Sequence, residues 1–221
     1  MYQRIGKRLL DLSLTIALLP IIVPLLALAW LAAWLSSGGT GLFAQERMGK
    51  NLKPFLIWKL RTMRTLPPDT PQDIFALTVR GDRRIGATGQ LLRRWKLDEL
   101  PQVWNVLRGE MSLVGPRPEV SEWVQRQRDQ FVPILKAQPG ITSLASIAFI
   151  NEELVLSGCE NPLDAYASSI LPRKIALNQL YTANVSLGLD LQIIALTVLA
   201  FFFPRQAIHR VGKLASEIST S

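Results

Sequence analysis

Residues 12–35 read LSLTIALLPIIVPLLALAWLAAWL, and this stretch contains no charged residue. As a straight helix rising about 1.5 Å per residue it would be roughly 36 Å long, more than the ~30 Å hydrocarbon core of a bilayer. The stretch is therefore long enough to anchor the chain in a membrane. A cleaved signal peptide fits less well, because the apolar run is too long and no small-x-small cleavage site clearly follows it.

Two features of this stretch favour a helix that enters the membrane and returns. Pro20 and Pro24 stand near its middle, where each removes a backbone donor and clashes with the preceding turn, so we expect a sharp bend. Lysine and arginine lie on both sides of the stretch, and the positive-inside tendency places both flanks in the cytoplasm. A re-entrant helix over residues 1–37 satisfies both observations.

The composition of the 221-residue chain narrows the chemistry. A net charge of +8 favours an anionic partner, such as nucleic acid, anionic lipid or a phosphorylated substrate, without choosing among them. The single cysteine, Cys159, excludes an intrachain disulfide, and the single histidine, His209, lies in a basic C-terminal tail. A histidine general base and a Cys/His zinc site are therefore not expected, which leaves carboxylates, cations, hydroxyls and hard metals.

Local patterns divide the rest of the chain into a globular domain, residues 38–188, and a C-terminal segment with a basic tail, residues 189–221. Strand-like stretches predict a short β-hairpin from 42–45 and 54–58. Helical spacing predicts helices over 91–97, 100–107, 119–130 and 172–182, and prolines predict a loop over 64–72.

The apolar residues 189–203 fit a core helix and a helix in the membrane interface equally well. The predicted fold class is therefore α+β and mostly helical. It combines a proline-broken re-entrant membrane helix with a small cytoplasmic globular domain, which carries interfacial amphipathic helices and the hairpin.

Residues 91–119, LLRRWKLDELPQVWNVLRGEMSLVGPRPE, hold the densest group of residues that could carry chemistry. The adjacent Asp98 and Glu99 either cap a helix start or supply a carboxylate that attacks phosphorus. Arg93 and Arg117 either form structural ion pairs or clamp phosphate, because a guanidinium offers a planar fork to phosphate oxygens. The sequence contains no GxxxxGK[ST] phosphate loop, which excludes a P-loop nucleotidase at the level of the motif.

Motifs along nearly the whole chain resemble a known family. They stand in the order Lys7-Arg8-x-x-Asp11, Phe43-x-Gln45-x-Arg47-x-Gly49, Lys59-Leu60-Arg61-Thr62-Met63, Asp82-x-Arg84-x-Gly86-x-x-Gly89, the 91–119 block, Pro139-Gly140-Ile141-Thr142 and Leu189-Asp190. In this order they are similar to the small monotopic bacterial phosphoglycosyl transferases, also called polyprenyl-phosphate sugar-1-phosphate transferases. The central block is the most specific of the matching pieces.

The resemblance implies a role for each matching site residue. Asp98 would be the nucleophile and would bind Mg²⁺, and Glu99 beside it would assist. The phosphate and substrate site would be formed by Lys59, Arg61, Arg93 and Arg117, and Asn151 and Glu152 are further candidates for it.

The resemblance also implies the reaction, its partners and its place. A sugar-1-phosphate would pass from a nucleotide-diphosphate sugar, expected to be a uridine diphosphate sugar, to undecaprenyl phosphate through a covalent aspartyl intermediate. This would be the first membrane step of a surface glycan or exopolysaccharide pathway, catalysed on the cytoplasmic face of the bacterial inner membrane. A homodimer is compatible with the resemblance, and nucleic acid is not an expected partner.

The sequence departs from the family pattern at three places. Leu19, instead of serine, precedes Pro20, and Glu110 replaces the aspartate of the common Gly-Asp-Met-Ser. Residues 143–153 read SLASIAFINEE, where many members have a Gly-Arg-containing segment associated with the nucleotide sugar. Asn151, Glu152 and Glu153 therefore either line that site or begin a helix.

An alternative function, which involves no catalysis, is that of a basic module that binds the membrane surface. Its support is the net charge and the apolar ends of the chain. Binding of that kind would weaken steeply with salt and would not need Mg²⁺.

Overall fold

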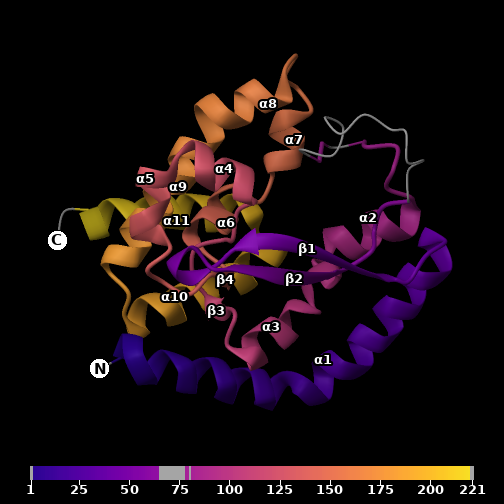
Figure 1. Ribbon diagram of the computed structural model, residues 1–221, viewed down its shortest axis with the longest axis horizontal. Coiled ribbons are helices and arrows are strands. Elements are labelled where there is room, and N and C mark those ends of the chain that lie inside the picture. Colours follow the sequence, from indigo (N-terminus) through magenta and orange to yellow (C-terminus); the bar gives the residue numbers. More distant parts are fainter. Residues whose placement is uncertain (1, 65–77, 80, 220–221) are drawn as a thin grey trace.

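A computed structural model describes residues 2–64, 78–79 and 81–219. Its first long element is helix α1, Lys7–Ser37, which follows a short π-helical turn at Tyr2–Gly6. Helix α1 continues through Pro20 and Pro24 and curves beneath the domain, so that its C-terminal part turns up beside the hairpin and α2 (Figure 1). Within the described residues, α1 is the one helix long and apolar enough to cross a membrane.

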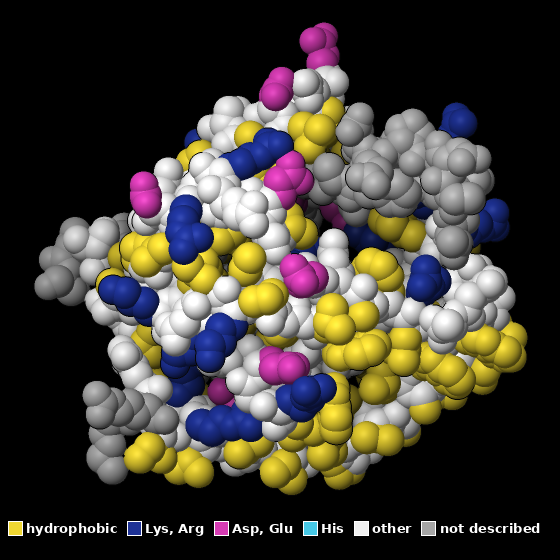
Figure 2. Space-filling model, in the orientation of Figure 1, with side chains coloured by type: hydrophobic (Ala, Val, Ile, Leu, Met, Phe, Trp, Pro, Cys, Tyr) yellow, Lys and Arg dark blue, Asp and Glu magenta, His cyan; other side chains and the backbone are white. Residues whose placement is uncertain are grey.

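Only the two ends of α1 are buried. Lys7, Asp11 and Thr15 are covered near its start, and Ala29, Ala33 and Ser37 near its end. Between them the helix exposes large apolar side chains, including Ile21 at 65% and Leu28 at 68%. Figure 2 shows these hydrophobic side chains as a continuous band along the lower edge of the molecule.

The predicted β-hairpin is confirmed. Strand β1, Leu42–Met48, pairs antiparallel with β2, Pro54–Leu60, in a register that joins Leu42 to Leu60 and Met48 to Pro54. A 3₁₀ turn at Lys50–Leu52 connects the strands, and Asn51 and Leu52 adopt positive φ there. Both strands are longer than the strand-like sequence patterns, because the ladder extends through Glu46 and Arg47 on β1 and through Lys59 and Leu60 on β2.

Helices make up most of the remaining domain. They are α2 Ala87–Arg94, α3 Gln102–Arg108, α4 Ser121–Arg126, α5 Arg128–Ile134, α6 Leu144–Ala148, α7 Glu152–Leu156, α8 Pro162–Ala165 and α9 Leu171–Ala183. A π-helical turn, Tyr166–Ile170, joins α8 to α9. The single helix predicted over 119–130 is wrong in detail, because a break at Gln127 divides it into α4 and α5. Most of the loop predicted over 64–72 lies outside the described residues.

A second, parallel pair of short strands brings two motifs together. Strand β3, Ser112–Val114, pairs with β4, Gly140–Thr142. A Cβ atom on Gly140 would lie 2.0 Å from the backbone nitrogen of Gly115, so the chains can approach this closely only with glycine. The pair holds the Gly-Pro-Arg-Pro segment against the Pro-Gly-Ile-Thr segment.

The C-terminal segment contains α10, Leu187–Phe202, and α11, Pro204–Ser219. One face of α10 belongs to the core, where Ile193 and Ala200 pack in the same cluster as Val114 and Leu144. The opposite face exposes large apolar side chains, such as Phe202 at 66%. The helix is therefore part of the core on one side and carries an uncovered apolar surface on the other.

Candidate active site

The Asp98-Glu99 dyad lies in a 3₁₀ turn, Leu97–Glu99, between α2 and α3. Lys96, which precedes the turn, has a left-handed backbone with φ 54° and reverses the direction of the chain there. Non-glycine residues seldom adopt this conformation, so its presence next to the dyad marks a locally constrained backbone. The turn buries both carboxyl groups, and Asp98 is only 8% exposed.

The carboxylate of Glu99 is fully engaged by cations. Arg117 donates from Nη2 to Oε1 at 2.5 Å and from Nη1 to Oε2 at 3.3 Å. The ammonium of Lys59 on β2 lies 3.8 Å from Oε1. Although burial acts to raise it, the charges of Arg117 and Lys59 hold the pKa of Glu99 below its usual range. Glu99 in turn raises the pKa of Arg117, so this pair stays ionised.

Asp98 has a different environment although it is the neighbouring residue. Its Oδ1 atom is buried and has no hydrogen-bond partner in the described part of the chain. Burial, and then the charge of Glu99, raise the pKa of Asp98, while Lys59, Lys96 and Arg93 act in the opposite direction. Two adjacent carboxyl groups whose pKa values are moved apart are typical of sites that carry out chemistry.

Lys59 supplies a cation whose charge depends on its surroundings. Burial lowers its pKa to about 8, Glu99 raises it, and the charges of Arg117 and Arg47 lower it further. The structure therefore brings four of the predicted site residues together, namely Lys59, Asp98, Glu99 and Arg117.

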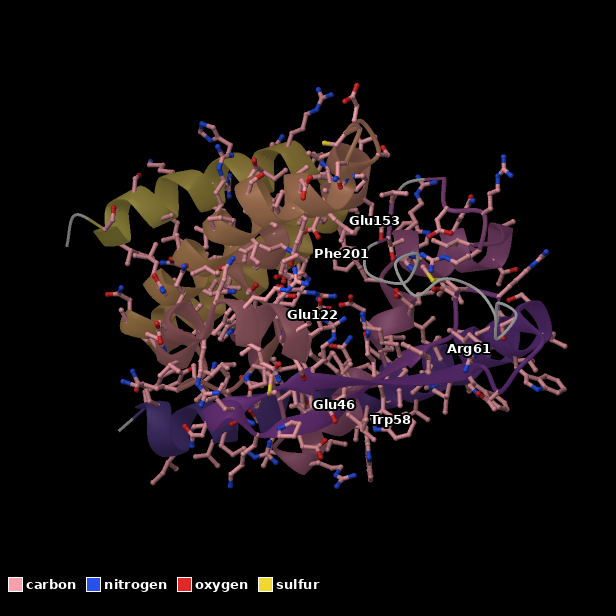
Figure 3. All side chains as sticks on the ribbon, turned by 45° about the horizontal axis from the view of Figure 1, so that its top comes forward. Glu46, Trp58, Arg61, Glu122, Glu153 and Phe201 are labelled. Atoms are coloured by element: carbon pink, nitrogen blue, oxygen red, sulfur yellow. The ribbon has the colours of Figure 1, made fainter. Side chains whose placement is uncertain are left out.

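Arg93 and Arg61 are placed differently from each other. Arg93 forms an ion pair with Glu153 of α7 and lies 3.4 Å from the hydroxyl of Thr62, and its charge also reaches Asp98. Arg61 lies at the end of the hairpin, where it donates to the carbonyl of Leu42 at 3.4 Å. Figure 3 shows Arg61 at that end of the hairpin and Glu153 on α7. Within the described residues no hydrogen bond or ion pair joins Arg61 to the dyad.

Asn151 and Glu152 begin helix α7, as one of the two sequence-based readings expected. Glu152 forms an ion pair with Lys174 of α9 at 2.5 Å. Asn151 lines an open cavity of about 410 Å³ with the α10–α11 junction, Phe203–Gln206. The next residue, Glu153, forms an ion pair with Arg93, whose charge acts on Asp98. Glu153 therefore links the start of α7 to the dyad.

Three buried groups behind the dyad received no role from the sequence. Arg47 on β1 donates to the carbonyl of Pro118 at 3.4 Å and lies 3.9 Å from the carboxylate of Glu119. The hydroxyl of Tyr166 donates to Glu119 at 3.2 Å. This network fixes the segment that directly follows Arg117. Arg47 belongs to one of the family motifs, so the sequence could have identified it as a site residue. No local sequence pattern could have identified Tyr166.

A second buried cluster fixes the start of α1. Asp190 of α10 accepts from Lys7 at 2.6 Å, from Tyr181 at 2.7 Å and from Tyr2. One turn further along α1, Asp11 accepts from the hydroxyl of Ser112 and the amide of Leu113, both at 2.9 Å. The Lys7-Arg8-x-x-Asp11 and Leu189-Asp190 motifs are therefore in direct contact, through the ion pair between Lys7 and Asp190.

The donor set at the dyad fits a divalent cation of the magnesium type. No group of three or more His, Cys, Asp or Glu side chains gathers anywhere in residues 2–64, 78–79 and 81–219. Mg²⁺, however, commonly takes one or two carboxylates and completes its shell with water and substrate phosphates. Asp98 is the residue that would hold it, since Glu99 is occupied by Arg117.

The fold and the site define a class of protein in which an apolar helix is joined, at both ends, to a domain with a buried carboxylate–cation cluster. Residues 2–204 match the family described as bacterial sugar transferase. The chain belongs to this family.

Individual relatives extend this assignment. The chain is 37% identical over 212 residues to an undecaprenyl-phosphate glucose phosphotransferase of Komagataeibacter xylinus, covering 93% of this chain and 37% of that protein. It is 38% identical over 197 residues to a UDP-glucose:undecaprenyl-phosphate glucose-1-phosphate transferase of Caulobacter vibrioides, covering 87% and 68%.

A third relative is closer in length. The chain is 35% identical over 208 residues to the exopolysaccharide production protein PSS of Rhizobium leguminosarum bv. phaseoli, covering 88% of this chain and 94% of that protein. The Komagataeibacter xylinus relative and two further relatives are much longer, and the chain spans only 37% to 42% of their length.

Proposed function

We propose that this protein transfers a sugar-1-phosphate from a nucleotide-diphosphate sugar to a polyprenyl phosphate at a membrane and releases a nucleoside monophosphate. The observation that carries the proposal is Asp98, a buried carboxylate with an unpartnered oxygen and cations on several sides. Family membership and the names of the relatives support the same reaction class.

The reaction divides into two displacements at one phosphorus. An oxygen of Asp98 attacks the phosphorus that carries the sugar, and the bond from that phosphorus to the bridging oxygen of the diphosphate breaks. The bonding electrons leave with the nucleoside monophosphate, so the sugar phosphate remains on Asp98 as an acyl phosphate. An oxygen of the polyprenyl phosphate then attacks the same phosphorus, and Asp98 departs as a carboxylate.

The surrounding side chains have separable tasks in this scheme. Arg117 and Lys59 hold Glu99 ionised and gather positive charge where the transferring phosphate must sit. Arg93 offers a second guanidinium on the side of α7. The same cations favour the ionised form of Asp98 that attack requires.

A bound Mg²⁺ would neutralise charge on the diphosphate and on the transferring phosphate. Asp98 would hold it, as the donor set indicates. The protein's own contribution is to orient the Asp98 carboxylate and to keep the opposing carboxylate of Glu99 engaged elsewhere.

The names of the relatives point to the substrates. Three are named for UDP-glucose and undecaprenyl phosphate, and another for UDP-N-acetylgalactosamine. A uridine diphosphate sugar is therefore the donor that we propose, and undecaprenyl phosphate the acceptor. The exopolysaccharide protein among the relatives supports a first step of surface glycan assembly.

The proposed topology is a re-entrant α1 in the bacterial inner membrane, with the domain on the cytoplasmic face. Lys7 and Asp11 at one end of α1 contact the same domain as Ala29 and Ala33 at the other end. A helix tied to one body at both ends, with an exposed apolar middle, can enter the bilayer and return.

Labelling of single cysteines tests this topology. With Cys159 removed, cysteines placed at Gly6 and Gly39 should react with an impermeant reagent from the same side of the membrane. Reaction from opposite sides would show that α1 crosses the bilayer.

Asp98→Asn tests the proposed nucleophile. The amide cannot form the acyl phosphate, so turnover of a labelled uridine diphosphate sugar with undecaprenyl phosphate should fall by at least about 10³-fold. Asp129→Asn, an exposed residue of α5, is the matched control and should keep its turnover. Near-normal turnover by a folded Asp98→Asn variant would remove Asp98 from this role, and salt-sensitive, Mg²⁺-independent lipid binding would then favour the non-catalytic module.

A further inference from the structure

Gln102, the first residue of α3, has a buried side chain whose polar atoms are unpaired. It is 1% exposed, and both Oε1 and Nε2 are without a hydrogen-bond partner in the described part of the chain. Buried side-chain amides are normally satisfied, so an amide left unpaired at both ends calls for a specific explanation. An apolar residue of the same size would fill this place without that penalty.

The backbone places this amide next to the dyad. Hydrogen bonds from the Leu100 amide to Leu97 and from the Val103 amide to Leu100 give the chain a 3₁₀ path from the dyad into α3. Gln102 follows Asp98 by four residues along this helical path, and residues three or four apart lie on the same face of a helix. The unpaired amide and the unpaired carboxylate therefore lie on the same face of this helical segment.

The two oxygens of Asp98 are not equivalent. Oδ1 is sealed from solvent without a partner, whereas Oδ2 is not among the sealed atoms. The nearby donors Arg117 and Lys59 are directed at Glu99. Gln102, on the same helical face, has a buried donor still available for Oδ1.

We propose that Gln102 is a positioning residue, whose amide Nε2 donates across one water molecule to Oδ1 of Asp98 and so keeps Oδ2 directed at the substrate phosphorus. No direct hydrogen bond joins the two described side chains, and a water molecule can bridge polar groups that do not touch. This inference rests on the proposed function, in which Asp98 is the nucleophile.

The positioning role explains why a polar side chain without a protein partner is retained in this buried place. A carboxylate that is free to rotate would present its oxygens to phosphorus in many orientations. Holding one oxygen from behind fixes the approach of the other, and an error of about 1 Å in such an approach slows a reaction roughly 100-fold. The amide would therefore act on the rate of attack and leave donor binding unchanged.

Gln102→Met, of similar size and without polar hydrogens, tests the inference. In a single turnover with a radiolabelled uridine diphosphate sugar and no lipid acceptor, the rate of adduct formation on Asp98 should fall roughly 100-fold. The KM for the donor should stay within about twofold, because the amide is proposed to act after binding. The melting temperature should be unchanged or higher, because a buried amide without partners is removed.

Two further variants separate positioning from general stability. Asn178→Leu removes another buried amide with an unpartnered oxygen, on α9 and away from the dyad, and should leave the rate of adduct formation unchanged. Gln102→Asn keeps an amide donor one carbon shorter and should retain more of the rate than the methionine variant.

Several results would overturn the inference. They are an unchanged adduct rate in Gln102→Met, a loss that follows the melting temperature across the three variants, or failure of Gln102→Met to fold. Absence of any adduct in the wild-type protein would instead overturn the proposed function, so the two failures are distinguishable.

Discussion

Two buried charge clusters lie in different parts of the same fold, and they differ in how completely their polar groups are satisfied. At the start of α1, Asp190 is fully buried and both of its oxygens accept hydrogen bonds, from Lys7, Tyr181 and Tyr2. At the dyad, Glu99 is paired in a similar way, but the adjacent Asp98 has a buried oxygen without a partner.

Under the proposed function, this difference separates attachment from chemistry. A buried network in which every group is satisfied holds elements in one arrangement, and here it ties α1 to α10. A buried carboxylate that is incompletely satisfied costs stability, and it is retained where a substrate, metal or water supplies the missing partner. Each of the following substitutions tests one side of the comparison.

The largest effect is expected for Asp190→Asn in the satisfied cluster. The substitution leaves the ammonium of Lys7 buried without its counter-charge, and breaking a buried pair in this way costs about 3–5 kcal/mol of folding free energy. The measurement is the denaturant midpoint of the purified protein in detergent. Asp164→Asn is the exposed control, with a shift below about 0.5 kcal/mol.

The comparison also predicts how turnover should respond to the two substitutions. Molecules of Asp190→Asn that remain folded should keep near-normal turnover, whereas Asp98→Asn should keep its stability and lose turnover. A full loss of turnover in folded Asp190→Asn would contradict the division between attachment and chemistry.

A smaller effect is expected for Arg117→Lys within the dyad cluster. Lysine keeps the charge but cannot make the two-pronged contact with Glu99, so turnover should fall about tenfold while the protein remains folded. Arg126→Lys alters an exposed arginine pair with Glu122 and serves as the control. Unchanged turnover would mean that only the charge of Arg117 matters.

The smallest effect is expected for Glu153→Gln. Glu153 holds Arg93, the second predicted phosphate ligand, and its side chain is 45% exposed, so the pair is weak. Freeing the guanidinium should lower the KM for the nucleotide sugar roughly two- to fivefold. Glu122→Gln, in the exposed pair with Arg126, is the control. A higher KM would show instead that Glu153 itself contacts the donor.

Much of this architecture was readable from local patterns. The apolar run, the hairpin and the helix of residues 172–182 follow from spacing and turn residues, and each is present in the structure. The break at Gln127 was missed, because a short interruption between two polar helices leaves no signal in hydrophobic periodicity.

The sequence predicted most residues of the candidate site, but it did not predict which of them contact one another. Asp98, Glu99 and Arg117 stand in one recognisable block, but Lys59 joins them only because β2 packs against the turn that carries the dyad. Arg61, two residues away, sits at the end of the same strand and contacts the hairpin instead. Neighbouring motif residues on a strand can thus end in different surroundings.

The sequence by itself determined the long apolar helix, the family and the candidate carboxylates, because apolar length and dense motifs are properties of contiguous residues. Tertiary structure alone decided that Glu99 pairs with Arg117 and that an oxygen of Asp98 has no partner. It also brought Asp190 into contact with Lys7, which is 183 residues away along the chain. The physical reason is that burial and charge neutralisation depend on distances between remote segments, and those distances exist only after the chain has folded.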